Sequence, residues 1–229
     1  KKLKERFYEP NSSLSEHRGK QLLDSYGIRT TEEELVGDKE EGVLAAERIG
    51  YPVVMKVISD DIRHKTDAGT VSLDVYEDEV ADTYEKLLAN AREYNPGAEV
   101  EGVLVQEMIT EKSYEVILGS SEDPDFGPLI TFGLGGIFVE LLEDVAFRLP
   151  PISSDSARRM IEETKGSKLL KGFRGEPAGD IDALIDTIVR FGKLASDWEG
   201  KISALDVNPL LVLSEGNGVV AVDSLVDFN

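Results

Sequence analysis

The chain has 229 residues, with 25 lysines and arginines against 45 aspartates and glutamates, so its formal charge is −20, and it has no cysteine. The absence of cysteine excludes disulfides, iron–sulfur clusters, thiolate zinc sites and cysteine nucleophiles. The strong negative charge argues against binding to nucleic acids or to anionic membrane surfaces, because both need a basic footprint. We expect a globular protein of one or two domains, in which an anionic ligand such as a nucleotide needs a local positive cluster.

Along the first hundred residues, helices and strands are predicted to alternate. Residues 1–13 are polar and predict an N-terminal arm. Beyond this arm, helices are predicted over residues 14–26, 39–49 and 78–94, and strands over residues 52–58 and 69–75. Gly27 and Gly50 follow the first two helices as stop signals. The stretch between the two strands is polar and charged and predicts a loop.

From about residue 99 the chain is richer in predicted strands, and its helices come late. Strands are predicted over residues 103–108, 114–119, 129–132, 202–206, 210–213 and 219–223, and helices over residues 153–164 and 180–196. This order favours an α+β fold, with a first lobe of residues 14–98 and a second lobe of residues 99–229, over one doubly wound sheet. No segment resembles a membrane span of ~20 apolar residues or a secretory leader, so a cytoplasmic location is expected.

A group of positive side chains lies in and after the first predicted strand. Lys56 sits inside this apolar strand, where a charge costs free energy unless an anion meets it; the alternative is a sheet-edge lysine whose head reaches water. Arg63, His64 and Lys65 follow in the polar loop, and loops held by strands often carry functional residues. The group could meet a phosphate, although His64 could also be a solvated loop residue. Metal binding by His64 is not expected, because no second histidine is near.

Oxygen-bearing side chains gather near the end of the sequence. Asp206 and Asn208 are two residues apart, so on a strand they share one face. A hairpin turn near residues 215–217 would place Asn208 roughly opposite Asp223, and three oxygen ligands would then converge. Hard cations such as Mg²⁺ take such ligands, usually one or two from the protein together with phosphate oxygens of a nucleotide. The alternative is a capped turn before Pro209.

Two further segments are not specific by themselves. The run Gly133-Leu-Gly-Gly136, which contains Gly135, could bring backbone close to a phosphate or could form a tight turn between strands. It lacks the third glycine of a dinucleotide fingerprint, and the chain has no phosphate loop of the GxxxxGK[ST] type. Gln106, Glu107 and Met108 end a predicted strand, and backbone groups beyond such an end could read an adenine edge.

Taken in order, these segments resemble the ATP-grasp fold and, more narrowly, the β subunits of the ADP-forming acyl-CoA (acetate–CoA) synthetases, relatives of succinyl-CoA synthetase. The resemblance spans nearly the whole chain, from about Leu14 to Val226. The runs that carry it are Tyr51-Pro-Val-Val-Met-Lys-Val-Ile58, His64-Lys-Thr-Asp-Ala-Gly69, Val105-Gln-Glu-Met108, Asp125-Phe-Gly-Pro-Leu-Ile-Thr-Phe-Gly-Leu-Gly-Gly-Ile-Phe-Val-Glu140 and Asp206-Val-Asn-Pro-Leu-Leu-Val212. The long glycine run and the run that begins at Asp206 are together specific.

The resemblance implies two α+β lobes with ADP or ATP held between them. It implies that Lys56, with Arg63 or Lys65, contacts the phosphates, and that the hinge Gln106, Glu107 and Met108 binds adenine. Glu115 would contact the ribose, and the backbone at Gly135 and Gly136 would approach the nucleotide. Asn208 and Asp223 would bind Mg²⁺, with Asp206 where the succinyl-CoA synthetase relatives have a glutamate. His64 matches the histidine that takes phosphate from an α-subunit phosphohistidine and passes it to the nucleotide. Succinyl-CoA synthetase lacks a β-subunit equivalent, which favours the ADP-forming acyl-CoA branch.

The other half of such an enzyme is not found in this sequence. The resemblance implies an α subunit with the CoA-binding domain and a second phosphohistidine, in an α2β2 type of assembly. The implied reaction is acyl-CoA + ADP + phosphate ⇌ carboxylic acid + ATP + CoA. Two alternatives remain: an ATP-grasp ligase that joins a carboxylate to an amine without a phosphohistidine, and a non-catalytic nucleotide-sensing subunit. The sequence does not identify the acyl group.

Overall fold

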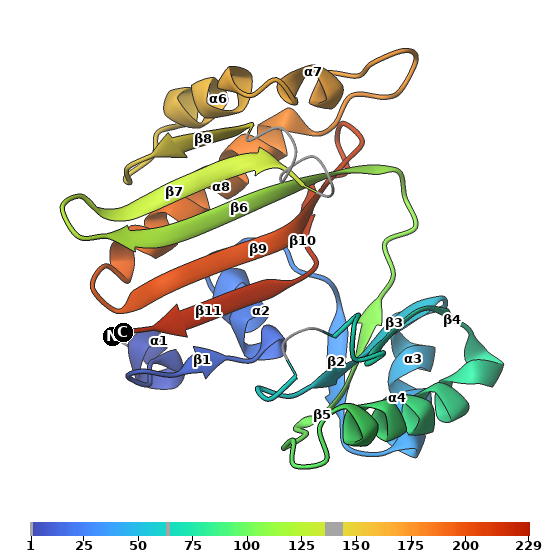
Figure 1. The fold of residues 1–229 in the computed structure, drawn as a ribbon. Helices are drawn as coiled ribbons and strands as arrows, with labels where there is room; N and C mark the ends of the chain where they lie inside the picture. The colour runs from blue at the N-terminus through green and yellow to red at the C-terminus, as the bar shows by residue number, and fades with distance from the viewer. Residues whose placement is uncertain (1, 63–64, 136–143) are drawn as a thin grey trace. The chain divides into compact units, whose positions relative to one another are not determined.

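The computed structural model describes residues 2–62, 65–135 and 144–229. The chain forms two compact units, each of which is described by itself. The large unit combines Lys1–Thr30 with Glu111–Asn229, and the small unit is Thr31–Thr110. Both units combine strands with helices, so the expected α+β class is confirmed (Figure 1).

In its described residues, the large unit contains a seven-stranded antiparallel sheet of order β1–β11–β9–β6–β7–β8, with β10 also paired to β9 (Figure 1). Its strands are β1 (Ser13–Leu14), β6 (Ser113–Asp123), β7 (Gly127–Leu134), β8 (Val145–Arg148), β9 (Ile202–Leu213), β10 (Val219–Ala221) and β11 (Ser224–Phe228). Its helices are α1 (Lys2–Phe7), α2 (Glu16–Asp24), α6 (Ser154–Glu163), α7 (Ser167–Leu170) and α8 (Ile181–Asp197).

The helices α2 and α8 cover one face of this sheet (Figure 1). On that face, Val116 and Leu118 of β6 and Leu205 and Val207 of β9 are buried in one apolar cluster with Phe191 of α8. Because successive side chains of a strand point to opposite faces, the residues between them project from the other face. We call this other face, opposite α2 and α8, the second face of the large sheet.

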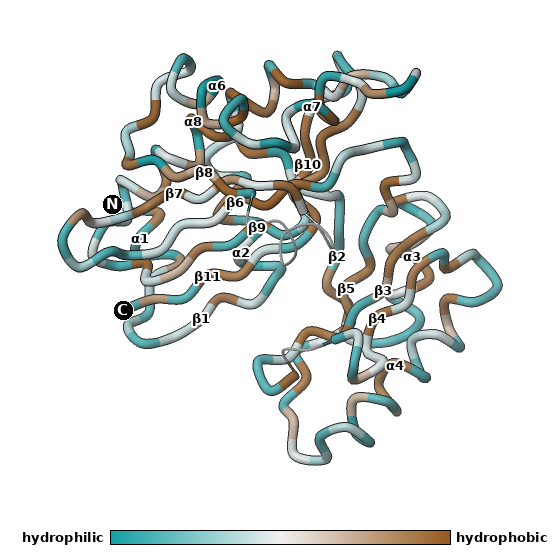
Figure 2. Tube along the Cα trace, turned by 45° about the horizontal axis from the view of Figure 1, so that its top comes forward, coloured by the Kyte–Doolittle hydropathy of each residue, from teal (hydrophilic) through white to brown (hydrophobic). Residues whose placement is uncertain are grey.

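The small unit contains, in its described residues, a four-stranded antiparallel sheet of order β2–β5–β3–β4. Its elements are β2 (Glu33–Val36), α3 (Lys39–Ile49), β3 (Val53–Ile58), β4 (Val71–Val75), the short helix η1 (Glu77–Glu79), α4 (Val80–Tyr94) and β5 (Gly102–Glu107). Figure 2 shows the apolar stretches of β3 and β5, the two central strands. Val53, Met55 and Val57 of β3 pack in one buried cluster with Ala46 of α3 and Leu87 of α4.

The boundaries of the two units differ from the expected lobes of residues 14–98 and 99–229. Residues 1–30 belong to the large unit, because β1 pairs with β11 and α2 packs against β11. Residues 99–110 belong to the small unit, because β5 lies between β2 and β3. The arm expected over residues 1–13 contains α1, whose Phe7 is buried in the core of the large unit.

Most predicted elements lie within a few residues of observed ones, with differences near the chain's end. The strands predicted over 202–206 and 210–213 are one strand, β9. The strand predicted over 219–223 is the shorter β10, and the alternating run Ser224–Phe228 forms the additional strand β11. The short strands β2 and β8 were not predicted either. None of the helices in the described parts of the chain is long and apolar enough to cross a membrane.

Tyr26, which follows α2, ties the N-terminal segment to the core of the large unit. Its phenol donates a hydrogen bond to Oδ2 of Asp197 at 3.1 Å and accepts one from Nε1 of Trp198 at 3.1 Å. Trp198 is fully buried and stacks against Phe228 of β11 at a centroid distance of 5.7 Å. Burial raises the pKa of Tyr26 from 10.0 to about 12.

We expect Tyr26→Phe to lower the free energy of unfolding by about 1 kcal/mol near neutral pH, because it removes the acceptor of the buried Trp198 indole. In the parent protein, the unfolded state loses the phenolic proton near pH 10 and the folded state keeps it to about 12. The stability that depends on the neutral phenol is therefore complete below about pH 10 and is lost as the pH rises to about 12. The difference in free energy of unfolding between Tyr26→Phe and the parent should therefore narrow or reverse as the pH rises from about 10 to about 12. Urea unfolding followed by Trp198 fluorescence measures it.

Tyr94→Phe, at a half-exposed tyrosine of α4, is the control and should change the stability near neutral pH by no more than about 0.5 kcal/mol. A difference between Tyr26→Phe and the parent that stays constant across the alkaline window would contradict the prediction.

Candidate functional site

Lys56 lies in the interior of the small sheet. It is on β3, which runs between β5 and β4, and it pairs with Leu104 on one side and Val71 on the other. Only 6% of the residue is exposed, so the alternative of a sheet-edge lysine reaching into water is wrong. Met55 and Val57 beside it pack toward α3 and α4, so Lys56 lies on the opposite face of the sheet. A buried ammonium group in this position favours a negatively charged partner.

The loop after β3 is anchored on both sides of its positive residues. Ile62 and Ala68 are buried in the core of the small unit. The backbone carbonyl of Lys65 accepts hydrogen bonds from the N–H of Thr70 at 2.9 Å and from its hydroxyl at 3.1 Å. The expected positive cluster is therefore described only in part. Arg63 and His64 lie outside the described residues.

The segment at the end of β5 is held by its own side chains. Gln106 is buried and pairs with Val54 of β3. Oε1 of Glu107 accepts from the backbone N–H of Glu32 at 3.0 Å, and the N–H of Glu107 donates to the Glu32 carbonyl at 2.8 Å. The sulfur of Met108 accepts from the N–H of Asp74 at 3.3 Å. The side chains of Glu107 and Met108 thus fix the course of this segment within the small unit.

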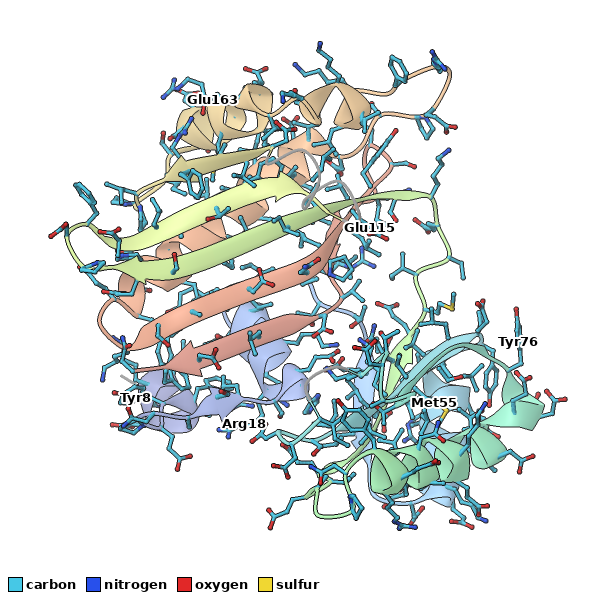
Figure 3. The ribbon with its side chains drawn as sticks, in the orientation of Figure 1. Tyr8, Arg18, Met55, Tyr76, Glu115 and Glu163 are labelled. Carbon is cyan, nitrogen blue, oxygen red and sulfur yellow. The ribbon has the colours of Figure 1, made fainter. Side chains whose placement is uncertain are left out.

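Glu115 and Gly135 lie against each other in the large unit. Glu115 is an exposed residue near the start of β6, on the second face, since its neighbour Val116 is in the core (Figure 3). The N–H of Gly135 donates to the Glu115 carbonyl at 2.8 Å. A Cβ atom at position 135 would lie 3.0 Å from both the carbonyl carbon and the Cβ of Glu115, so close backbone approach requires glycine there. Gly136 lies outside the described residues.

The strand register places Asn208 opposite Asp223. β9 pairs Leu210 with Ala221 of β10, and Val207 with Ser224 of β11. Both pairs belong to one continuous antiparallel register, in which the residues between them, Asn208 and Asp223, face each other. The N–H of Val222 donates to the carbonyl of Pro209 at 3.1 Å and supports this pairing. This register agrees with the predicted opposition, and the alternative of a capped turn before Pro209 is wrong because β9 runs through it.

Asp206 lies on the same face of β9, two residues before Asn208. It pairs with Leu225 of β11 and with Gly119 of β6. A Cβ atom at Gly119 would lie 3.4 Å from Oδ1 of Asp206, so the glycine leaves room for this carboxylate. Burial raises the pKa of the Asp206 carboxyl. Asp206 and Asn208 therefore lie on the second face of the large sheet, and the register brings Asp223 beside them.

These side chains fit a hard divalent cation. One amide and two carboxylates are the oxygen donors that Mg²⁺ prefers, and such a site usually keeps room for waters and phosphate oxygens. Within the described parts of the chain, no group of three or more histidine, aspartate or glutamate residues could hold a metal ion by itself.

One charged pair of the large unit was not singled out from the sequence. Glu16 and Lys20 of α2 are buried, with 5% and 1% of their surface exposed. Opposite charges four residues apart on a helix are typical of an exposed pair, so their spacing gave no signal of burial. Only the packing of α2 on β11 reveals it.

Comparison with known proteins identifies the family. Residues 7–227 match the family model described as an ATP-grasp domain. The chain is 44% identical over 216 residues to acetate–CoA ligase (ADP-forming) II subunit beta of Pyrococcus furiosus, covering 94% of this chain and 91% of that protein. It is 43% identical over 216 residues to 4-hydroxybutyrate–CoA ligase (ADP-forming) of Nitrosopumilus maritimus, covering 94% of this chain and 31% of that protein.

Two solved structures of one enzyme are similar to this chain over nearly its whole length. The dinucleotide-forming acetyl-coenzyme A synthetase 1 of Ca. Korarchaeum cryptofilum, in complex with coenzyme A, Ca-AMPCP and HgCl+, has a TM-score of 0.89 at 40% identity and covers 95% of this chain and 93% of that one. A second structure of that enzyme, with coenzyme A and Mg-AMPPCP, has a TM-score of 0.82 at 38% identity and the same coverage. This chain therefore belongs to the ATP-grasp domain family and, within it, to the β subunits of the ADP-forming acetate–CoA ligases.

Proposed function

We propose that this β subunit carries a phosphoryl group between a histidine of a partner subunit and ADP, with His64 as the relay. A nitrogen of His64 would attack the phosphorus of the partner's phosphohistidine, whose N–P bond breaks as the new one forms. An oxygen of the ADP β-phosphate would then attack the same phosphorus, releasing His64 and forming ATP. Splitting one transfer into two shorter ones is the general advantage of a covalent intermediate. A Korarchaeum relative has been described with its phosphohistidine segment pointing towards the nucleotide-binding site.

Several of the predicted residues would bind the nucleotide. Lys56, with Arg63 and Lys65, would offset the charge of the phosphates, which is the main requirement of phosphoryl transfer. The segment Gln106, Glu107 and Met108 would bind adenine through its backbone, since the carboxylate of Glu107 already accepts from Glu32. The exposed carboxylate of Glu115 would accept from the ribose hydroxyls, beside backbone groups of Gly135 and Gly136.

Asn208 and Asp223, with Asp206 beside them, would hold Mg²⁺. The strand register that brings these residues together supports this part of the proposal. When bound, the cation would neutralise negative charge on the nucleotide phosphates. The relatives are ADP-forming CoA ligases, which favours acyl-CoA ligation over the alternative of a carboxylate–amine ligase.

The partner subunit would carry the remaining chemistry. The name of the P. furiosus relative as a subunit beta implies a further subunit. We propose an α subunit with the CoA-binding domain, the acyl-CoA site and the first phosphohistidine, in an α2β2 type of assembly. This chain spans only 31% of the N. maritimus ligase, so much of that longer protein has no counterpart here. The assembly would work in the cytoplasm, where ADP and CoA are available.

We expect His64→Ala to abolish phosphoryl transfer in the reconstituted complex and to leave ADP affinity essentially unchanged, because the nucleotide is held by other groups. The test incubates the chain with Mg²⁺ and γ-labelled ATP, with and without the candidate α subunit, and maps acid-labile, base-stable label. The label should lie on His64 and should return to added ADP.

The matched control is His17→Ala, at the chain's only other histidine. This ring contacts the Gln21 side chain at 2.8 Å on α2, and its loss should change neither label nor turnover. Wild-type turnover of His64→Ala would overturn the relay.

We expect Asp223→Asn to raise the Kd for Mn²⁺, used in place of Mg²⁺, by at least about tenfold in the ADP complex, because a neutral amide replaces a charged ligand. Binding is measured by the electron paramagnetic resonance signal of free Mn²⁺. The matched control is Asp227→Asn on β11, the strand that begins directly after Asp223; its side chain accepts from the hydroxyl of Ser13 and should not affect the metal. Equal Mn²⁺ affinity of Asp223→Asn and the parent would remove Asp223 from the site.

A further inference from the structure

Stability alone does not explain the buried ion pair of Glu16 and Lys20 in α2. Nζ of Lys20 lies 3.0 Å from Oε1 of Glu16, and both residues are almost completely buried. Removing two charges from water is costly, and an apolar pair of similar volume often stabilises a protein equally well or better. We therefore expect Glu16 or Lys20 to make a contact that an apolar side chain could not make.

Lys20 makes such a contact with the segment that carries Asp223. Its Nζ donates a hydrogen bond to the backbone carbonyl of Val222 at 3.1 Å. The N–H of Val222 donates to the carbonyl of Pro209 at 3.1 Å. Val222 lies between β10 and β11, so this corner is fixed to β9 through its N–H and to α2 through its carbonyl.

The hydrogen bond from Lys20 bears directly on the orientation of Asp223. The Val222 carbonyl and the Asp223 N–H belong to one planar peptide group, so holding the carbonyl fixes the plane from which Asp223 projects. On the other side of Asp223, the N–H of Ser224 donates to Oδ1 of Asp223 at 2.7 Å. The hydroxyl of Ser224 donates to the carbonyl of Glu16 at 3.3 Å, so this residue also contacts α2.

The backbone of α2 packs closely against β11 at this point. A Cβ atom at Gly19 would lie 2.5 Å from Oγ of Ser224 and 3.4 Å from Cγ2 of Val226. Glycine at this position therefore lets the helix backbone approach β11 directly. The first turns of α2 and the corner before β11 form one closely packed group.

We propose that Lys20 is a positioning residue for the metal site: it holds the Val222–Asp223 peptide so that the Asp223 carboxylate meets the cation opposite Asn208. Lys20 acts through the backbone and does not itself bind the ligand, which is a divalent cation with a nucleoside diphosphate. The inference rests on the proposed role of Asp223. Groups that orient metal ligands are known to change metal affinity strongly when they are replaced.

The test compares Lys20→Met with the parent chain by Mn²⁺ binding in the presence of ADP, and by ADP binding without metal. Methionine keeps the apolar stem and removes the donor, so the Kd for Mn²⁺ should rise about tenfold while metal-free ADP affinity stays unchanged. Lys20→Arg, which keeps a cationic donor, should recover most of the loss. The matched control is Lys193→Met, in an exposed i,i+4 pair with Asp197, and should change neither affinity.

The outcomes separate this inference from the proposed function. If Asp223→Asn leaves Mn²⁺ affinity unchanged, the metal assignment fails first. If Asp223→Asn weakens Mn²⁺ binding and folded Lys20→Met does not, the positioning role alone is wrong. If Lys20→Met does not fold, by Trp198 fluorescence and circular dichroism, Glu16→Gln takes its place. This milder change should still weaken Mn²⁺ binding, and an unchanged Kd would overturn the proposal.

Discussion

The candidate metal site depends on the antiparallel register of β9 against β10 and β11. Two short strands lie along one long strand in a single register, and the two residues between them include Asp223. A slip by one residue would turn every side chain of β11 to the other face. Ser224, Val226 and Phe228 are buried on alternate positions, so a slip would expose them and bury Asp227. The hydrophobic core of the large unit therefore fixes where its oxygen ligands stand.

Charge explains why such a site needs a cation. The chain has a formal charge of −20, and the second face of the large sheet carries Glu115 and Asp206, with Asp223 near Asp206 in the strand register. A nucleotide brings further negative charge, which these carboxylates would repel unless a divalent cation lay between. Within the small unit, Lys56 is a buried positively charged residue.

The large unit is assembled from the two ends of the chain. Leu14, Leu22 and Leu23 from its first thirty residues are fully packed in the same core as Val226 and Phe228. β1 adds a strand beside β11, and α2 packs against it. Contacts this far apart in sequence carry a cost in loop closure that their buried apolar surface must offset. As a result, an N-terminal helix supports the segment that carries Asp223.

Local patterns in the sequence were sufficient to predict most helices and strands and to identify the family. The apolar spacing predicted α3 at its observed residues and α8 within one, because helix periodicity is a local property. The runs around Lys56 and Asp206 pointed to nucleotide and metal chemistry, and the opposition of Asn208 and Asp223 followed from one hairpin. The sequence by itself thus determined most elements and the family, while the roles of Lys56, His64, Asn208 and Asp223 stay predictions.

Tertiary structure decided what depends on contacts between distant segments. The sequence could not show that residues 14–30 belong to the large unit, because Leu14 pairs with Val226, more than 200 residues further along the chain. It could not show that Lys56 is interior, since the order of strands in a sheet is not a local property. Glu16 and Lys20 have the spacing of a surface pair, and only the approach of α2 to β11 buries them. Burial is a property of the packed chain, which is why side-chain identity and spacing left these points open.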